Sequence, residues 1–110
     1  MPRTYETQQT CPVARALGVV GDRWTLLLVR DLLRGRSRFT EFEESLAGIS
    51  PNVLSARLKT LEEDGVLSRT VTSERPPRTE YVLTEKGRAL SPVVGAMFDW
   101  GTEWEPSAAE

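Results

Sequence analysis

The chain has 110 residues, of which 39% are hydrophobic and 27% charged, with a formal net charge of −2, which fits a single globular domain over residues 1–110. It contains no histidine, the commonest general base and metal ligand, and its single cysteine excludes an internal disulfide and is too few for a zinc site. Without a Gly-rich phosphate loop, a signal-peptide core or an apolar run of about 20 residues, we expect a cytoplasmic protein that is not an enzyme and has no cofactor, metal or membrane association.

Charge is unevenly distributed along the chain. Residues 34–88 hold ten basic and nine acidic side chains, whereas residues 89–110 hold four acidic side chains and no basic one. The distribution of charge matters more for nucleic-acid binding than its sum. We therefore expect a middle segment that contacts phosphate and a tail with another role.

Two helices are expected in the first third of the chain. Pro12 suits the first position of a short helix that ends at Val20. Gly21 breaks this helix, and Asp22 is suited to be the N-cap of a second helix over residues 24–33. That second helix is apolar nearly all round, which predicts that it forms the centre of the core.

An arginine-rich turn and a short third helix follow. Arg36 and Arg38 lie in a turn that can include a short strand, and they are expected either to contact phosphate or to form a solvated basic loop. Thr40 and Glu43 have the spacing of a capping box, at the start of a helix predicted over residues 39–47.

The stretch from Ile49 to Gly65 carries a complete set of helix signals. Ser50 is a good N-cap, Pro51 suits the first helical position, and Gly65 is a natural stop. Leucines at helical spacing form one apolar stripe, and the opposite face is small or polar, as in a helix whose N-terminal half enters a DNA major groove. A solvated helix face would explain this stretch alone equally well. The predicted DNA-facing residues around helix 51–64 are Ser50, Asn52, Ser55, Ala56 and Lys59.

The next segment predicts a β-hairpin over about residues 66–84. Residues 66–73 are β-branched and partly alternating, residues 79–84 form a second strand, and two prolines keep the loop between them out of the ladder. A hairpin directly after a helix-turn-helix is the wing of a winged helix. Arg75 and Arg78, near its tip, would then reach a minor groove or its phosphates.

The last segment, about residues 85–104, is predicted to be a helix capped by Thr84 with apolar residues at spacings of three and four. Pro92 falls inside this run and either bends the helix or marks its true start. The apolar stripe exceeds what a small core needs, which favours pairing with a second copy over closure of the domain's own core. The predicted interface residues are Tyr5, Val94, Met97, Phe98, Trp100, Gly101 and Trp104.

Taken in order, these pieces resemble the HxlR family of winged-helix transcriptional regulators, relatives of the MarR group. The matching motifs include Cys-Pro-Val at 11–13, Gly-Asp-Arg-Trp-Thr-Leu-Leu at 21–27, Arg-Phe-Thr-Glu-Phe at 38–42, and the stretches 49–65 and 76–87. The resemblance implies a mainly α fold with a small β-hairpin, a winged helix-turn-helix with N- and C-terminal dimerisation helices.

The resemblance also implies a function. We expect a homodimer that binds a pseudo-palindromic operator in double-stranded DNA as a transcriptional regulator, in the first instance a repressor. Aromatic residues at a dimer interface can enclose a cavity for a small-molecule effector. The alternative is a winged-helix protein-interaction module without specific DNA binding, which the near balance of charge and the acids Glu62, Glu63 and Asp64 leave open.

Asn52, Arg57 and Cys11 each have more than one possible role. Asn52 stands where many members of the family carry a base, which would weaken one phosphate contact or let an amide read adenine. Arg57 lies beside the leucine stripe and is expected either to brace the domain or to reach a phosphate. Cys11 opens the segment through which several relatives sense oxidants, aldehydes or quinones.

A thiol at a helix N-terminus meets the positive end of the helix dipole, which favours the reactive thiolate. Packing as a small apolar residue at an interface is the alternative role for Cys11. Because the chain has no second cysteine, sensing would require a Cys11–Cys11 bridge between protomers, a mixed disulfide or direct alkylation.

Overall fold

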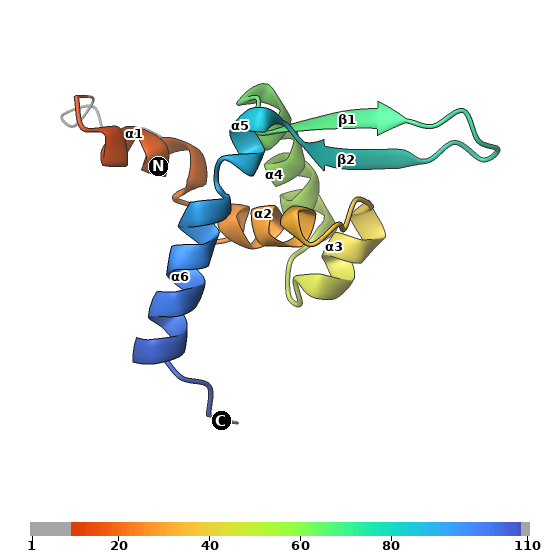
Figure 1. The fold of residues 1–110 in the computed structure, drawn as a ribbon. Coiled ribbons are helices and arrows are strands. Elements are labelled where there is room, and N and C mark those ends of the chain that lie inside the picture. Colours follow the sequence, from red (N-terminus) through yellow and green to blue (C-terminus); the bar gives the residue numbers. More distant parts are fainter. Residues whose placement is uncertain (1–9, 109–110) are drawn as a thin grey trace.

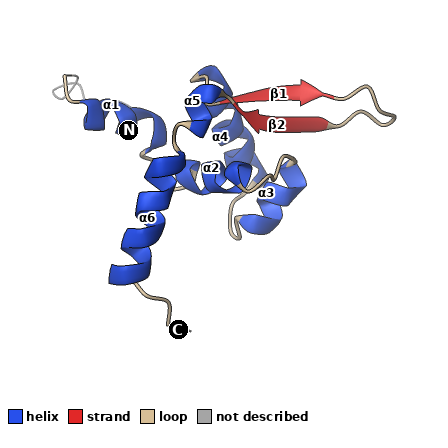
Figure 2. Cartoon of the chain, in the orientation of Figure 1, coloured by secondary structure: helices blue, strands red, loops and turns tan. Residues whose placement is uncertain are grey.

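The computed structural model describes residues 10–108, which form six helices and one antiparallel hairpin (Figure 1). The helices are α1 (Pro12–Val20), α2 (Thr25–Leu33), α3 (Phe39–Ser45), α4 (Pro51–Glu63), α5 (Glu85–Arg88) and α6 (Ser91–Trp104), and the strands are β1 (Leu67–Val71) and β2 (Thr79–Leu83). The predicted fold, mainly helical with a small hairpin after a helix-turn-helix, is confirmed. Figure 2 shows the hairpin, α1 and α6 extending in different directions from a centre made by α2, α3 and α4.

Helix α2 lies at the centre of the core, as its apolar sequence predicted. Leu28 and Val29 are fully buried and Leu32 nearly so, whereas Leu27 on the other side of the helix is partly exposed. The remaining members of the core cluster are Phe42, Leu46, Leu54, Leu58, Leu61, Val66, Leu67 and Leu83. Three of these are the leucines of the α4 stripe, so this stripe is buried as predicted and the opposite face of α4 is directed outward.

The N-cap residue of α2 is Trp24 and not Asp22 as predicted, but the Asp22 side chain still binds the N–H groups at the start of α2 and also reaches α4. The backbone N–H groups of Trp24 and Thr25 donate to Asp22 Oδ1 at 2.9 and 3.0 Å, and the Thr25 hydroxyl donates to Oδ2. Arg57 Nη1, from the middle of α4, lies 3.8 Å from the same Oδ2. One carboxylate therefore joins the first turn of α2 to α4.

Asp31 makes the corresponding link at the other end of α2. Its side chain is fully buried, and Oδ1 accepts hydrogen bonds from Arg30 Nη2 at 3.1 Å and Arg36 Nη1 at 3.2 Å. Arg30 Nη2 also donates to Ser45 Oγ at 3.3 Å, at the last residue of α3. A buried carboxylate is tolerated only when it is paired, so this network holds the segment before α3 and the end of α3 against α2.

The predicted capping box at the start of α3 is wrong. The helix begins after Arg38, so its third position is Glu41 and not Glu43. Glu41 Oε1 accepts hydrogen bonds from the backbone N–H groups of Ser37 and Arg38 at 3.0 and 2.9 Å, which hold the pKa of Glu41 below its ordinary value. The expected short strand before α3 is reduced to one hydrogen bond, from Tyr81 N to Ser37 O at 2.8 Å.

Capping and glycine geometry fix the other helix ends. The Ser50 hydroxyl accepts from Val53 N at 3.2 Å at the start of α4, as predicted. Gly48 in the turn before α4 and Gly65 after it have φ values of +92° and +76°, a backbone conformation that side chains with a Cβ rarely adopt. The turn between α3 and α4 therefore has a defined geometry.

The C-terminal segment is two helices, because Pro92 lies in the first turn of α6 and marks its true start. The short α5 is capped by Thr84, whose hydroxyl accepts from Gly87 N at 3.1 Å. A Cβ on Gly87 would overlap the Val66 carbonyl, so glycine lets α5 pack against the start of the hairpin. No residue of α6 is buried, and the helix extends from the core in Figure 1.

Asp22 gives a test of the link between α2 and α4. Replacing Asp22 by alanine removes its side-chain hydrogen bonds to the start of α2 and should lower the free energy of unfolding by about 1 kcal/mol at neutral pH. Burial raises the pKa of Asp22, but hydrogen bonds from Thr25 and Trp24, with Arg57 nearby, outweigh burial and hold the pKa below its ordinary value. The charged Asp22 carboxylate therefore stabilises the folded state at pH values above its unfolded-state pKa of about 3.9. This stabilisation is lost as the pH falls through the lower pKa that Asp22 has in the folded protein.

Asp22→Asn should accordingly show a smaller loss of stability than the wild type as the pH falls below about 4. Urea unfolding, followed by circular dichroism from neutral to acid pH, measures this difference. Glu44→Gln, which removes an exposed carboxylate from α3, is the matched control and should follow the wild type. Identical acid dependence of the Asp22→Asn and wild-type proteins would contradict the role assigned to Asp22.

Candidate nucleic-acid interface

The outward face of α4 is small, polar and exposed. Asn52, Ser55, Ala56 and Lys59 are all exposed, while the leucines between them are buried. Ser50 is exposed as well, but its hydroxyl is already engaged in capping α4. Four of the five residues predicted for this face therefore present their side chains to solvent without a structural task in the described part of the chain.

This face of α4 continues into a groove beside the hairpin. The groove has a volume of about 350 Å³ and is lined by Ser55, Leu58, Lys59, Glu62, Arg69 and Tyr81. Arg69 Nε in β1 lies 3.9 Å from Glu62 Oε2 in α4. Helix α4 and the hairpin thus form one continuous polar surface, as a winged helix needs to contact adjacent parts of a duplex.

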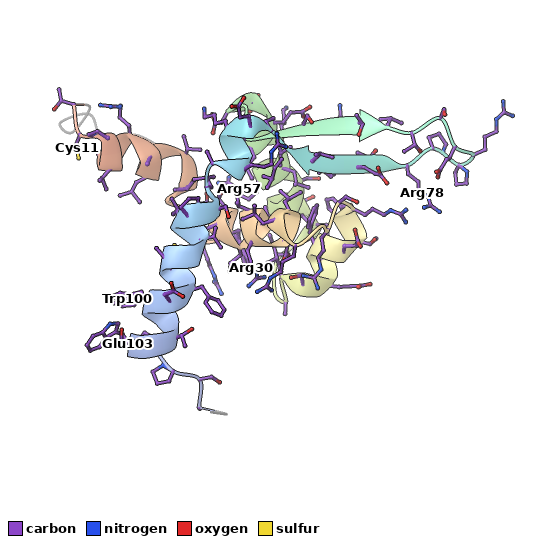
Figure 3. All side chains as sticks on the ribbon, viewed as in Figure 1. Cys11, Arg30, Arg57, Arg78, Trp100 and Glu103 are labelled. Carbon is purple, nitrogen blue, oxygen red and sulfur yellow. The ribbon has the colours of Figure 1, made fainter. Side chains whose placement is uncertain are left out.

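The hairpin tip carries two exposed arginines. Thr72 N donates to Arg78 O at 2.7 Å, and Arg78 N donates to the Thr72 hydroxyl at 3.0 Å, so the loop is closed by these bonds. Arg78 Nε lies 3.4 Å from Glu74 Oε2, and Arg75, which lies between them in the sequence, is exposed. Figure 3 shows the Arg78 side chain at the far end of the hairpin, away from α6.

Two predicted phosphate contacts, Arg36 and Arg57, have partners inside the protein. Arg36 is bound to the buried Asp31, although its side chain remains 42% exposed. Arg57 faces Asp22, and its Nε is buried without a hydrogen-bond partner among the described residues. Of the two roles expected for Arg57, this position favours bracing the domain.

Arg38 is the N-cap residue of α3 and is half-buried. Its backbone N–H donates to Glu41 Oε1, so the backbone of this residue fixes the first turn of α3. Its side chain lies in the same segment as Arg36, between α2 and α3, and its contact with phosphate stays a prediction.

Arg69 lines this groove but is not among the residues predicted from the sequence. The available signal was its spacing from Leu67, because residues two apart in a strand share one face. Leu67 is buried, so Arg69 occupies a position on the face turned toward the helices, where an apolar residue is usual. The strand register, which decides its partner across the hairpin, could not be read from the sequence.

The predicted interface residues on α6 form an exposed apolar surface. Met97, Phe98, Trp100 and Trp104 each have more than half of their surface exposed, and Val94 and Gly101 are partly buried. A groove of about 430 Å³ runs between α6 and α2, lined by apolar residues of both helices and by Arg30 and Arg34. Tyr5 lies outside the described residues.

Cys11 lies at the N-cap position of α1 and is a half-buried free thiol. Two apolar residues in the first turns of α1 are exposed in the described part of the chain, Val13 at 67% and Leu17 at 43%, whereas Val20 at its end is buried. Figure 3 shows Cys11 at the end of α1 that lies farthest from the hairpin. Within residues 10–108, no cluster of acidic or cysteine side chains is placed to hold a metal ion, and no helix is long and apolar enough to cross a membrane.

Comparison with known proteins identifies the family. Residues 19–109 match the model of the HxlR-like helix-turn-helix family. YvaP of Bacillus subtilis, an uncharacterized HTH-type transcriptional regulator, is 46% identical over 101 residues, which cover 90% of this chain and 94% of YvaP.

Solved structures with similar sequences have the same fold. The crystal structure of PA1607 is 43% identical, with a TM-score of 0.86 over 96% of this chain and 74% of that chain. The redox regulator HypR in its reduced form is 39% identical, with a TM-score of 0.79 over 84% of this chain and 91% of that chain. The protein therefore belongs to the HxlR-like helix-turn-helix family of transcriptional regulators.

Proposed function

We propose that the protein is a homodimeric repressor that binds a pseudo-palindromic operator in double-stranded DNA, with α4 in the major groove and the hairpin tip on the flanking backbone or minor groove. The observation that carries this proposal is the exposed polar face of α4, which opens into the groove beside the hairpin. Small residues such as Ser55 and Ala56 allow the helix to approach base edges closely, while Asn52 supplies an amide that can pair with adenine.

The basic residues divide into two groups in this proposal. Lys59 on α4 and Arg75 and Arg78 on the hairpin are exposed and contact phosphates directly. Arg36 and Arg57 act through the carboxylates that hold them, by fixing the positions of α3 and α4. Phosphate contacts fix the register of the protein on the duplex, and the face of α4 reads the sequence.

Lys59 and Arg78 test this interface. Lys59→Ala and Arg78→Ala should each weaken binding to DNA beside the protein's own gene and lower the salt slope of the binding constant by about one unit, because each variant loses one phosphate contact. Gel shifts at several salt concentrations measure both quantities. Arg23→Ala is the matched control, because Arg23 stacks on the Trp24 ring at 4.8 Å and lies outside the groove.

Specific binding that both variants retain with an unchanged salt slope would refute the assignment of α4 and the hairpin. Failure of the wild-type protein to bind any DNA would instead favour the protein-interaction module. In that case the acidic end of α4 would be part of a protein-binding surface.

The exposed stripe of α6 supports the dimer. Large apolar residues that remain uncovered in one copy of a small domain mark an interaction surface, and the uncovered residues of α1 extend it. Pairing through α6 and α1 would bring two α4 helices onto one face of the duplex about 34 Å apart, the length of one DNA turn. The groove between α2 and α6 is where a second copy would enclose a small-molecule effector.

Charge placed in the α6 stripe should separate the dimer. Phe98→Glu and Trp104→Glu would bury a carboxylate in an apolar interface, so we expect monomers in sedimentation equilibrium and a large loss of operator affinity. Asp99→Ala is the control. With about 3.6 residues per turn, Asp99 lies on the side of α6 opposite the apolar stripe, so this variant should leave the dimer intact. A wild-type monomer, or a dimer that survives both charged variants, would contradict this interface.

Cys11 is proposed to make the repressor responsive to thiol-reactive signals. Its place at the start of α1 and the description of the similar HypR as a redox regulator support this role. With one cysteine per chain, the simplest reaction is addition of the Cys11 thiolate to an electrophilic carbon. The sulfur forms the new bond, the electrophile takes up the proton, and no oxidant is needed.

A thiol-reactive electrophile should therefore release wild-type protein from operator DNA but leave Cys11→Ser bound. Fluorescence anisotropy with labelled operator follows release, and mass spectrometry of the intact protein counts the adducts. Equal release of both proteins, or an adduct on Cys11 with unchanged DNA binding, would show that the thiol is not the switch.

A further inference from the structure

We propose that Arg69 of β1 is a further phosphate contact and that Glu62 of α4 restrains it when no DNA is bound. The pair would act as an exchangeable ion pair at the junction of α4 and the hairpin. This inference rests on the proposed DNA-binding function and adds to it a residue outside the helix face and the hairpin tip. It also gives an acidic residue of α4 a defined role in binding.

The hairpin register shows that Arg69 lies on the inner face of the strand. Leu67 pairs with Leu83, and Arg69 pairs with Tyr81 two residues further on. Both leucines are buried, and the Tyr81 ring packs edge-on against Phe42 with centroids 6.1 Å apart. Since side chains two apart share a face, Arg69 is directed toward the helices and not toward the outer side of the hairpin.

The fold does not need an arginine at this position. Arg69 is 54% exposed and replaces the apolar side chain that the inner face of a half-buried strand usually carries. Its described ion-pair partner is Glu62, which is itself 41% exposed and has one oxygen 3.9 Å from Nε. A single exposed contact at this distance contributes little to stability. Departures from the expected pattern without a structural gain are most often functional.

The surroundings of Arg69 indicate what it binds. It shares the groove with Lys59, and Ser55, Lys59 and Glu62 recur at spacings of four and three, so they lie on one side of α4. Lys59 and Arg69 therefore approach the same space from the helix and from the strand. Two cations that converge on an open groove match a DNA phosphate, and the guanidinium can bind its oxygens through two N–H groups.

Glu62 makes the contact conditional. When a duplex approaches, Arg69 can exchange one exposed carboxylate for the concentrated negative charge of the backbone. Glu62 is then left beside the phosphates and opposes binding to every DNA sequence. Because this repulsion costs about the same on operator DNA and on other DNA, it lowers the affinity for both and leaves their ratio unchanged.

A bracing role for the pair makes the opposite prediction for Glu62. If Arg69 and Glu62 only hold the hairpin against α4, then removing either charge should weaken DNA binding to a similar degree. If Glu62 restrains Arg69, then Glu62→Gln frees the arginine and strengthens binding. The sign of the Glu62→Gln effect therefore separates the two roles.

The experiment measures binding of the full chain to operator DNA and to unrelated DNA over a range of salt concentrations. Arg69→Ala should weaken binding to both DNAs and lower the salt slope by about one unit. Glu62→Gln should tighten binding to both DNAs by up to about fivefold and leave the difference between them unchanged. Glu62→Gln should tighten binding less in the Arg69→Ala background than in the wild type, because Glu62 then has no arginine to restrain and only its repulsion of the phosphates is removed.

Glu80→Gln is the matched control, because Glu80 pairs with Thr70 on the opposite face of the hairpin and should leave the salt slope unchanged. Thermal unfolding checks that each variant is folded. Weaker DNA binding by Glu62→Gln would overturn this inference alone. So would an unchanged salt slope for Arg69→Ala if Lys59→Ala does weaken binding. Absence of DNA binding by the wild type would overturn the proposed function as well.

Discussion

Two carboxylates at the ends of α2 determine where the helix-turn-helix lies. Asp22 at the first turn faces Arg57 of α4, and the fully buried Asp31 near the last turn holds Arg36 before α3. Arg30 extends the second link to Ser45 at the end of α3. Removing one partner from a buried ion pair leaves an uncompensated charge in the interior. Separating Asp31 from its arginines would therefore cost much free energy.

These links determine the surface that the protein presents. The leucine stripe of α4 alone would allow the helix to rotate or slide slightly on the core, because apolar packing is weakly directional. Arg57 lies against Asp22 on one side of α4, which favours the orientation in which the face containing Ser55 and Lys59 lines the groove beside the hairpin.

Features that depend on neighbouring residues could be predicted from the sequence. Ser50 and Thr84 cap α4 and α5 as predicted, because a cap hydroxyl binds a backbone N–H only three residues further on. The stripe of α4 and the apolar α2 were equally readable from their spacing. The wrong capping box at α3 also has a local cause. Thr40 and Glu43 match the capping pattern, but the Glu41 carboxylate binds the N–H groups of Ser37 and Arg38, so the helix starts earlier.

Features that join distant residues could not be predicted. Nothing in the sequence pairs Arg57 with Asp22, 35 positions away, or pairs Arg36 with the buried Asp31. The spacing of β1 placed Arg69 on one face of a strand, but its partner depends on the hairpin register and on where α4 ends. The split of the C-terminal segment at Pro92 was one of two local alternatives, and packing of α5 against the hairpin decides between them.

The chain has a net charge of −2, and several of its arginines are bound to groups of the protein itself, so few cations are left for DNA. Arg30, Arg36 and Arg57 are bound to interior or capping carboxylates, and Arg88 donates to the Leu83 carbonyl at 2.7 Å. The described cations left for the duplex are mainly those of the groove and the hairpin tip. Such a sparse set gives one copy only a few phosphate contacts, which limits its affinity at physiological salt.

In the proposed dimer, two linked copies would overcome this limit without additional charge. Once one copy is bound, the second meets its half-site at a high effective concentration, so the affinity of the pair far exceeds that of either copy. This gain requires that the two α4 helices be held at a fixed separation. A rigid α6 with uncovered Trp100 and Trp104 at one end and the domain core at the other is suited to hold them so. In the proposed dimer, the sparse charge of the interface and the large apolar stripe of α6 would be complementary: each copy alone would bind weakly, and pairing through the stripe would make binding strong and selective for a symmetric site.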